Sequence, residues 1–236
     1  MSVLLSQPIR VAREMAGTNS SSLTDQACID YASGALLDIR KAFIKGGVDV
    51  GNIQETYFTP TAGVGQYNYP QGPTPPACML IKTLWVNFND TTQNNYVPVG
   101  KYDAGNLPEG TSLDYLRVNQ PTADPIYDDH GSWFEILPTP QSTFPNLTNA
   151  IKMIYFVLPT PYATTGDTVQ YPENQDPDIL AYGIQARHLR SQFKFTEADA
   201  MEKQMYARIT GAVAMMGGGG QSTVSPTPIG LTGYEF

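Results

Sequence analysis

The sequence predicts an α+β protein: an antiparallel helical bundle built from both chain ends, with an inserted β-rich module of sandwich or barrel type and an extended C-terminal tail. Three observations predict this fold class. Before residue 47 and after residue 176, apolar side chains recur every three or four positions, as on the buried face of a helix. Between these segments the apolar period becomes two and turn residues multiply, which indicates strands. The last twenty residues begin with four glycines and hold too little apolar surface to fold alone.

These patterns divide the chain into four expected parts. Residues 1–50 supply the first half of the helical bundle, and residues 176–216 supply the second half. Residues 51–175 form the inserted acidic β-rich module, and residues 217–236 form a flexible C-terminal arm. With 236 residues, of which 41% are hydrophobic, the chain can bury a sizeable core without metals or disulfides.

The N-terminal half of the bundle is expected to contain two helices. Residues 6–16 predict a short one, because proline is tolerated in a first helical turn, where Pro8 lies. A longer helix follows, with Thr24 as its N-cap and Gly46 and Gly47 as its stop. Its apolar stripe consists of Cys28, Tyr31, Ala35, Ile39 and Ala42, widened by Leu36 and Phe43.

The C-terminal half of the bundle is also expected to contain two helices. The stripe of the first consists of Ile179, Tyr182, Ala186, Leu189 and Phe193. Thr196 is expected to cap the second, whose stripe consists of Ala198, Met201, Met205, Ile209, Ala212 and Met216. These helices and the N-terminal pair can bury their stripes only on one another or on a neighbouring copy. A four-helix bundle closed by both chain ends is therefore the economical prediction.

The middle of the chain is expected to be mostly strands and loops. TYFTPTAGVGQYNYP predicts a strand, a turn and a second strand, and its AGVG segment is interpreted as a hairpin turn. Stronger strands are expected in MLIKTLWVNF, WFEILP and AIKMIYFVLP. The last two must stop at Pro138 and Pro159, because proline lacks the donor that a strand ladder needs. Residues 89–112 and 115–132 are rich in Asn, Asp, Pro and Gly, and they are expected to form long loops.

The whole chain has a net charge of −8, and its negative charge is concentrated in the middle of the sequence. Residues 51–175 carry eleven acidic side chains against four basic ones, which are Lys82, Lys101, Arg117 and Lys152. The helical segments on either side are electrically balanced. An acidic module repels a phosphate backbone, which argues against a nucleic-acid clamp built on it. We therefore expect copies of the chain to associate through the neutral helical segments 24–45 and 178–215.

The strongest candidate for catalysis is YDDHG, where Asp128, Asp129 and His130 lie close to Trp133. Adjacent carboxylates and a histidine could hold a divalent ion or orient a base. The same composition is typical of a turn before an aromatic strand, and we favour the turn. The sequence contains neither a phosphate-binding loop nor a nucleophile elbow. It therefore predicts a protein that is not an enzyme and that has no cofactor and no metal site.

Cellular location is indicated by three weaker signals. Nothing in the sequence pairs Cys28 with Cys78, which indicates a reducing compartment. MSVLLSQPIR lacks the apolar stretch of a secretory signal. No apolar run approaches the ~20 residues of a membrane span. We expect synthesis in the cytosol and no membrane contact.

The order of segments carries further information. LSQPIRVAREMAG and LTDQACIDYASGALLDIRKAF give paired helices, and ETYFTPTAGVGQYNYP and MLIKTLWV give a hairpin and a strand. FEILPTP ends a strand in proline, and DPDILAYGIQARHLRSQFKF and TEADAMEKQMYARI close the order with helices. Over about residues 3–215, this order resembles the head-to-tail adaptor proteins of tailed bacteriophages, also called connectors or neck-ring proteins. PQGPTPPAC, the loops in 89–132 and the glycine-hinged tail depart from the plainest members.

The resemblance implies a structural virion protein at the head-tail junction, made in the host cytoplasm. It implies a homo-oligomeric ring, commonly a dodecamer, that sits below the portal protein and extends the DNA channel. The other face of the ring would meet the tail, a nozzle or the next neck protein. Genomic DNA would pass through during ejection without sequence-specific binding. A wall that repels phosphates suits such a conduit.

The C-terminal tail is the candidate binding segment, because some adaptors grip the portal with a terminal arm. Its glycines would let it leave the bundle, and its apolar strip would dock in extended form on the portal or a neighbouring subunit. The candidate contact residues are Val224, Pro226, Pro228, Ile229, Leu231, Tyr234 and Phe236. Tyr234 and Phe236 are the expected anchors, since aromatic side chains dominate interface energetics. The alternative is an end that binds nothing.

Three other functions fit parts of the sequence. The first is a tail-completion protein, or another neck-ring protein, that does not contact the portal. The second is a carbohydrate-binding surface module on a helical stalk, against which the missing secretory signal counts. The third is a hydrolase that uses Asp128, Asp129 and His130.

Overall fold

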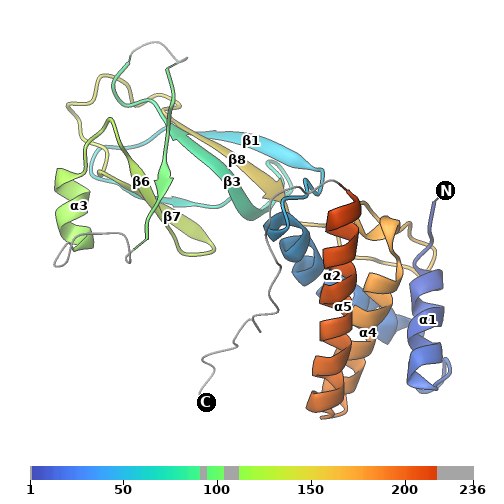
Figure 1. The fold of residues 1–236 in the computed structure, drawn as a ribbon. Helices are drawn as coiled ribbons and strands as arrows, with labels where there is room; N and C mark the ends of the chain where they lie inside the picture. The colour runs from blue at the N-terminus through green and yellow to red at the C-terminus, as the bar shows by residue number, and fades with distance from the viewer. Residues whose placement is uncertain (1, 91–94, 104–111, 217–236) are drawn as a thin grey trace. The chain divides into compact units, whose positions relative to one another are not determined.

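The structure, a computed structural model, describes residues 2–90, 95–103 and 112–216 (Figure 1). These residues divide into two compact units, each considered by itself below. The helical unit comprises the described residues of Met1–Gly51 and Pro159–Phe236, and the β unit those of Asn52–Leu158. The mixed α+β fold class predicted from the sequence is confirmed.

The helical unit joins the two ends of the chain. Its helices are α1 (Ser6–Ala16), α2 (Asp25–Lys45), α4 (Asp178–Ser191) and α5 (Phe195–Met215). Helix α4 packs against α1, α2 and α5, and Figure 1 shows it between α1 and α5. The predicted packing of N-terminal helices on C-terminal helices is therefore confirmed.

The bounds of α2 follow from local sequence signals. The side-chain oxygen of Thr24 accepts a hydrogen bond from the N–H of Ala27 at 3.2 Å, as an N-cap does. At the other end, the N–H of Gly46 donates to the carbonyl of Ala42 at 3.0 Å. The expected cap of α5 was wrong, because α5 begins at Phe195 and the residue before it, Lys194, makes no side-chain capping bond.

Helices α2 and α4 approach each other closely at a glycine. A Cβ atom placed on Gly183 would lie 2.8 Å from the Cβ of Ala35 and 3.4 Å from the sulfur of Met205. Only a residue without a side chain allows this separation between the backbones. As a result α4 is buried on nearly all sides, and Ser191 is its one exposed residue.

The segment between the β unit and α4 is fixed to the N-terminal helices. The N–H of Leu5 donates to the carbonyl of Asp167 at 2.8 Å. Further along, a short 3-10 helix (Glu173–Gln175) carries Glu173 into the interior, where its carboxylate lies 3.0 Å from Nε of Arg40. Arg40 also donates to the side-chain oxygen of Gln170 at 2.8 Å. A buried ionic contact therefore ties α2 to the chain that leads into α4.

Acidification is expected to destabilise the helical unit through His188. This side chain is 7% exposed, and its Nε2 lies 3.0 Å from Nε2 of Gln192. Burial, with a smaller contribution from the charge of Lys194, holds the pKa of His188 below its usual value of 6.5. Near that pH the unfolded chain therefore binds more protons, so the stability that neutral His188 contributes is lost as the pH falls through the folded-state pKa.

This prediction can be checked by thermal melts followed by far-ultraviolet circular dichroism. The melting temperature of the wild-type chain should fall between about pH 7 and about pH 5, and that of His188→Gln should fall less. Equal decreases in both proteins would contradict it, because carboxylates elsewhere titrate in both.

The β unit contains two four-stranded sheets among its described residues. The first has the order β1 (Ile53–Phe58), β8 (Ile151–Val157), β3 (Cys78–Val86) and β4 (Val97–Pro98). The second has the order β2 (Gln66–Asn68), β7 (Trp133–Leu137), β6 (Ile126–Asp129) and β5 (Gly100–Lys101). Neighbouring strands are antiparallel except β5 and β6, which are parallel. Strands β7 and β8 end before Pro138 and Pro159, as predicted.

An aromatic core joins the two sheets. Alternate residues of β8, namely Ile151, Met153 and Tyr155, are fully buried in it. Phe134 of β7 is also fully buried, and its ring centroid lies 5.5 Å from those of Phe58 and Tyr67. Burial of alternate residues is the pattern of strands with one face toward a core.

The predicted hairpin between β1 and β2 was wrong. Strand β1 pairs with β8 and strand β2 pairs with β7, so the AGVG segment connects two different sheets. The connection is held by β7 and the residues after it: the N–H of Gly63 donates to the carbonyl of Pro140 at 2.8 Å, and the N–H of Ile136 donates to the carbonyl of Gly65 at 2.9 Å.

The two predicted long loops were wrong in part. They contain β4, β5, β6 and a short helix, α3 (Leu113–Asn119). The side chain of Ser112 caps α3 by accepting from the N–H of Tyr115 at 3.2 Å. Leu116 is the buried residue of this helix.

Candidate functional site

The predicted binding residues of the arm cannot be located. Val224, Pro226, Pro228, Ile229, Leu231, Tyr234 and Phe236 lie outside the described residues. Their role therefore stays a prediction. The described residues instead offer surfaces on the two units, and these are built up below from their side chains.

The candidate catalytic cluster forms the end of the β6–β7 hairpin. Asp129 accepts hydrogen bonds from the hydroxyl of Tyr69 and, at 3.1 Å, from the ammonium of Lys101. Burial alone would raise the pKa of Asp129, but these bonds and one from the N–H of Gly131 bring it below its usual value.

His130 belongs to the same turn, but its side chain has different partners. Its Nε2 lies 3.2 Å from a carboxylate oxygen of Asp128, and its ring stacks on Trp133 with centroids 3.7 Å apart. Asp128 and Asp129 therefore have separate partners. Within the described parts of the chain, no group of three His, Cys, Asp or Glu side chains could hold a metal ion. The geometry fits a structural turn.

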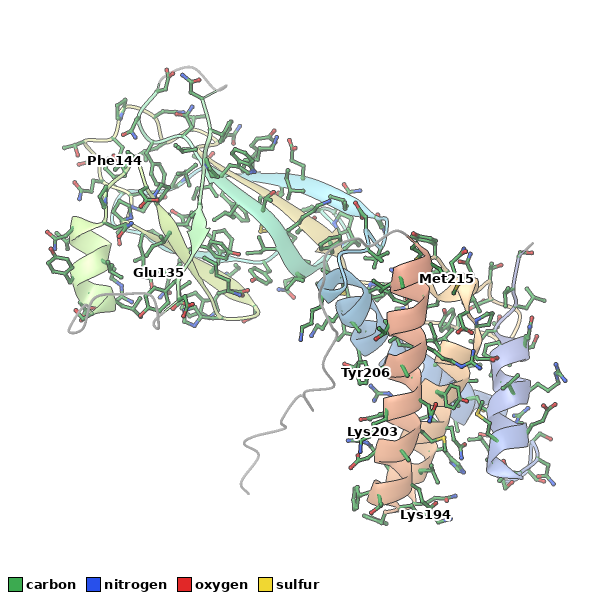
Figure 2. All side chains as sticks on the ribbon, in the orientation of Figure 1. Glu135, Phe144, Lys194, Lys203, Tyr206 and Met215 are labelled. Atoms are coloured by element: carbon green, nitrogen blue, oxygen red, sulfur yellow. The ribbon has the colours of Figure 1, made fainter. Side chains whose placement is uncertain are left out.

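Carboxylates of the β unit hold most of its cations. Nζ of Lys101 lies 3.1 Å from Asp129, and Nζ of Lys152 lies 2.8 Å from Glu55. The guanidinium of Arg117 makes a two-pronged contact with Glu135, at 2.7 and 2.9 Å, and fixes α3 to β7. Figure 2 labels Glu135 in this unit.

The β unit has an acidic excess, and part of it is exposed. Its sequence, 52–158, holds nine acidic and four basic side chains, and Lys101, Arg117 and Lys152 have carboxylate partners within the unit. Asp124 is exposed, and the side chain of Asp114 is 85% exposed. Such a surface has a negative potential that repels polyanions.

Helix α5 offers the open face of the helical unit. Figure 2 shows Lys203, Tyr206 and Met215 along it, with Lys194 at its N-terminal end. From residue 200 onward its exposed residues are Ala200, Lys203, Gln204, Ala207, Thr210, Gly211, Ala214 and Met215. Lys203 is the one charged residue of this set, which recurs at helical spacing. A face of small side chains with little charge suits close packing against another helix.

A comparison with models of protein families gave a match that covers nearly the whole chain. A family model described as SU10 adaptor protein matches residues 7–230, which is nearly the entire sequence. No curated protein matched the chain. None of the described helices is both long and apolar enough to cross a membrane.

Proposed function

Because the chain belongs to the SU10 adaptor protein family, a family of phage head-tail adaptors, we propose that it forms a ring below the portal that joins the phage head to the tail. The match over residues 7–230 is the observation that carries the proposal. Membership of this family makes the chain a structural protein of the phage particle. The ring, its dodecameric form and its contact with the portal are the parts that we propose.

In this ring, genomic DNA leaves the head through a channel that the ring extends. The acidic surface of the β unit supports this role, because a wall that repels phosphates lets a polyanion slide without being bound. The same charge opposes association between copies of the β unit. Subunits therefore meet through their helical units, and the acidic surface faces the channel or the tail protein below.

The exposed residues of the helical unit support a subunit contact made by fewer helices than expected from the sequence. Segments 24–45 and 178–215 were both expected to contribute, yet α4 exposes one residue and is occupied by its own neighbours. Helix α5 keeps an exposed face of small residues with a single charge. We assign one side of the subunit contact to this face.

Attachment to the portal is assigned to the C-terminal arm, residues 217–236. Its glycines permit many backbone directions, and Tyr234 and Phe236 supply large apolar anchors. The arm is expected to lie extended along the portal, as in other recognition modes that use an extended peptide.

The proposal is tested by electron microscopy of purified portal mixed with the full-length chain or with a chain ending at residue 216. The full-length chain should cover one face of the portal as a ring. The truncated chain should keep the wild-type circular dichroism spectrum and lose attachment. The double substitution Tyr234→Ala with Phe236→Ala should lose attachment, as the truncation does. The matched control, Thr232→Ala, should attach normally.

The outcomes separate the parts of the proposal. Normal attachment by the truncated chain would show that the arm does not carry the contact. A full-length chain that binds tail components and never the portal would identify a tail-completion protein and overturn the position below the portal.

A further inference from the structure

The turn between α4 and α5 carries two exposed aromatic side chains. Phe193 is 82% exposed and Phe195 is 57% exposed, and their ring centroids lie 6.3 Å apart in an edge-to-face arrangement. We call residues 193–195 the aromatic turn. Large aromatic side chains in such exposure are typical of interface anchors.

The backbone of the aromatic turn has an unfavourable conformation at Phe193. Phe193 has a φ of 60°, in the left-handed region that is unfavourable for a bulky residue. Helices that end in this conformation usually place glycine there. The N–H of Phe193 donates to the carbonyl of Arg190, and that of Lys194 to the carbonyl of Leu189, both at 3.0 Å. The chain thus holds a phenylalanine at a position suited to glycine, which indicates a use for its side chain.

A groove large enough to hold an aromatic side chain lies along α1 in the same unit. Its volume is about 450 Å³, and its lining includes Ser6, Ile9, Arg10, Arg13, Thr18 and Thr165. This volume is within the range of about 300–1,000 Å³ that is usual for pockets enclosing a small ligand, so an aromatic ring fits. The side-chain oxygen of Thr18 is buried and has no hydrogen-bond partner among the described residues.

The lining of the groove is mostly polar or charged, and two of its features suit an aromatic ring. Ile9 is 2% exposed and gives it an apolar floor. Arg10 pairs with Glu14 at 3.0 Å and Arg13 with Asp25 at 2.6 Å, which holds both guanidinium groups at its rim. Guanidinium groups are attracted to the faces of aromatic rings. Because the two ion pairs are neutral overall, the groove does not favour a charged occupant.

The aromatic turn and the groove are placed so that they could meet between neighbouring subunits of a closed ring. A cyclic ring needs two different patches on each subunit that meet at the same height along the ring axis. Figure 1 shows α1 and α5 on different sides of α4, with the α1–α2 link and the α4–α5 turn at the same end of the helical unit. The groove runs along α1, with Thr18 and Asp25 lining it at that end and Ser6 at the other.

We propose that the aromatic turn of one copy inserts into the α1 groove of the next copy. This inference rests on the ring put forward above and names its subunit contact. It commits to a second copy of this chain as the occupant of the groove. The α5 face then continues the same contact beyond the turn.

The substitution Phe193→Gly separates folding from assembly. Glycine adopts a φ of 60° without strain, so the melting temperature should be equal to or above that of the wild type. Incorporation of the chain into phage particles should fall at least about tenfold, because an interface anchor is lost. The matched control is Tyr115→Ala, which removes an aromatic side chain that is 58% exposed on α3, outside the proposed contact, and should incorporate normally. Normal incorporation of Phe193→Gly would overturn the proposal.

Cysteine cross-linking identifies the partner. The double variant Lys194→Cys with Thr18→Cys keeps both aromatic rings of the turn and both arginines of the groove, and in purified phage particles under mild oxidation it should give a ladder of disulfide-linked multimers of this chain. Each single variant should give no ladder, which also controls for Cys28 and Cys78. Thr18 is chosen because it lines the groove and its hydroxyl has no hydrogen bond to lose among the described residues.

The remaining outcomes each have one meaning. Particles that contain the chain without any ladder would overturn the inserted turn and leave the adaptor ring intact. A cross-link from Lys194→Cys to the portal would show that the turn binds the portal and would also overturn the inserted turn. Particles that never contain the chain would overturn the proposed function itself.

Discussion

Replacing Arg40 with alanine is expected to lower the free energy of unfolding of the helical unit by about 3–5 kcal/mol, since it leaves a buried charge without a partner. Arg40 is 3% exposed and Glu173 is fully buried, with Nε and the carboxylate 3.0 Å apart. One carboxylate oxygen of Glu173 has no hydrogen-bond partner among the described residues. The removal of Arg40 would also leave the side-chain oxygen of Gln170 without its donor.

A double substitution controls for the loss of packing. Arg40→Met with Glu173→Leu removes both charges and keeps apolar volume, so it should be much less destabilising than Arg40→Ala alone. Urea unfolding followed by far-ultraviolet circular dichroism measures both, because helices dominate that signal. A loss below about 1 kcal/mol for Arg40→Ala would show that the pair is not buried as described.

Replacing Phe134 with alanine is expected to lower the free energy of unfolding of the β unit by about 3–5 kcal/mol. Its ring is fully buried between the two sheets, in contact with the rings of Phe58, Tyr67 and Tyr69. Its removal would leave a cavity lined by aromatic side chains that cannot easily collapse. Both tryptophans, Trp85 and Trp133, lie in the β unit, so tryptophan fluorescence reports its unfolding.

The matched control is Tyr115→Ala. Tyr115 is 58% exposed on α3, so its removal should change the stability by less than about 0.5 kcal/mol. Equal losses for the two variants would mean that the aromatic core is not the main source of stability in this unit.

The helical unit could be predicted because its signals are local. The spacing of Cys28, Ala35 and Ile39 marks the buried face of α2, and Thr24 marks its start. Each signal acts within a few residues, and amphipathic helices from two chain ends have few ways to hide their apolar faces. The start of α5 was misplaced because backbone contacts, and not a side-chain cap, begin that helix.

Strand pairing could not be predicted in the same way. Periodicity identifies a strand but not its partner, and β1 pairs with β8 almost a hundred residues later in the sequence. The short strand β6 was interpreted as a turn because Asp128 and Asp129 are common in turns, although both pair with β7. Helix α3 was missed because it has a single buried residue, Leu116.

The surfaces proposed for assembly differ in how far the sequence reveals them. The arm was predicted from its composition and from the terminal arms of some adaptor proteins. The aromatic turn was not, because Phe193 falls on the predicted apolar stripe of α4 and was expected to be buried, whereas α4 ends before it. Phe193 follows the helix in the left-handed region and is 82% exposed, and spacing carries no information about either.

The pairing of β1 with β8 places the beginning and the end of the inserted segment side by side, with the N–H of Val157 donating to the carbonyl of Asn52 at 3.0 Å. An insertion whose entry and exit meet in this way can change in length or content without separating the two host segments that it joins. Natural recombination can therefore exchange such a cassette, or lengthen its distal loops, while the host helices keep their sequence.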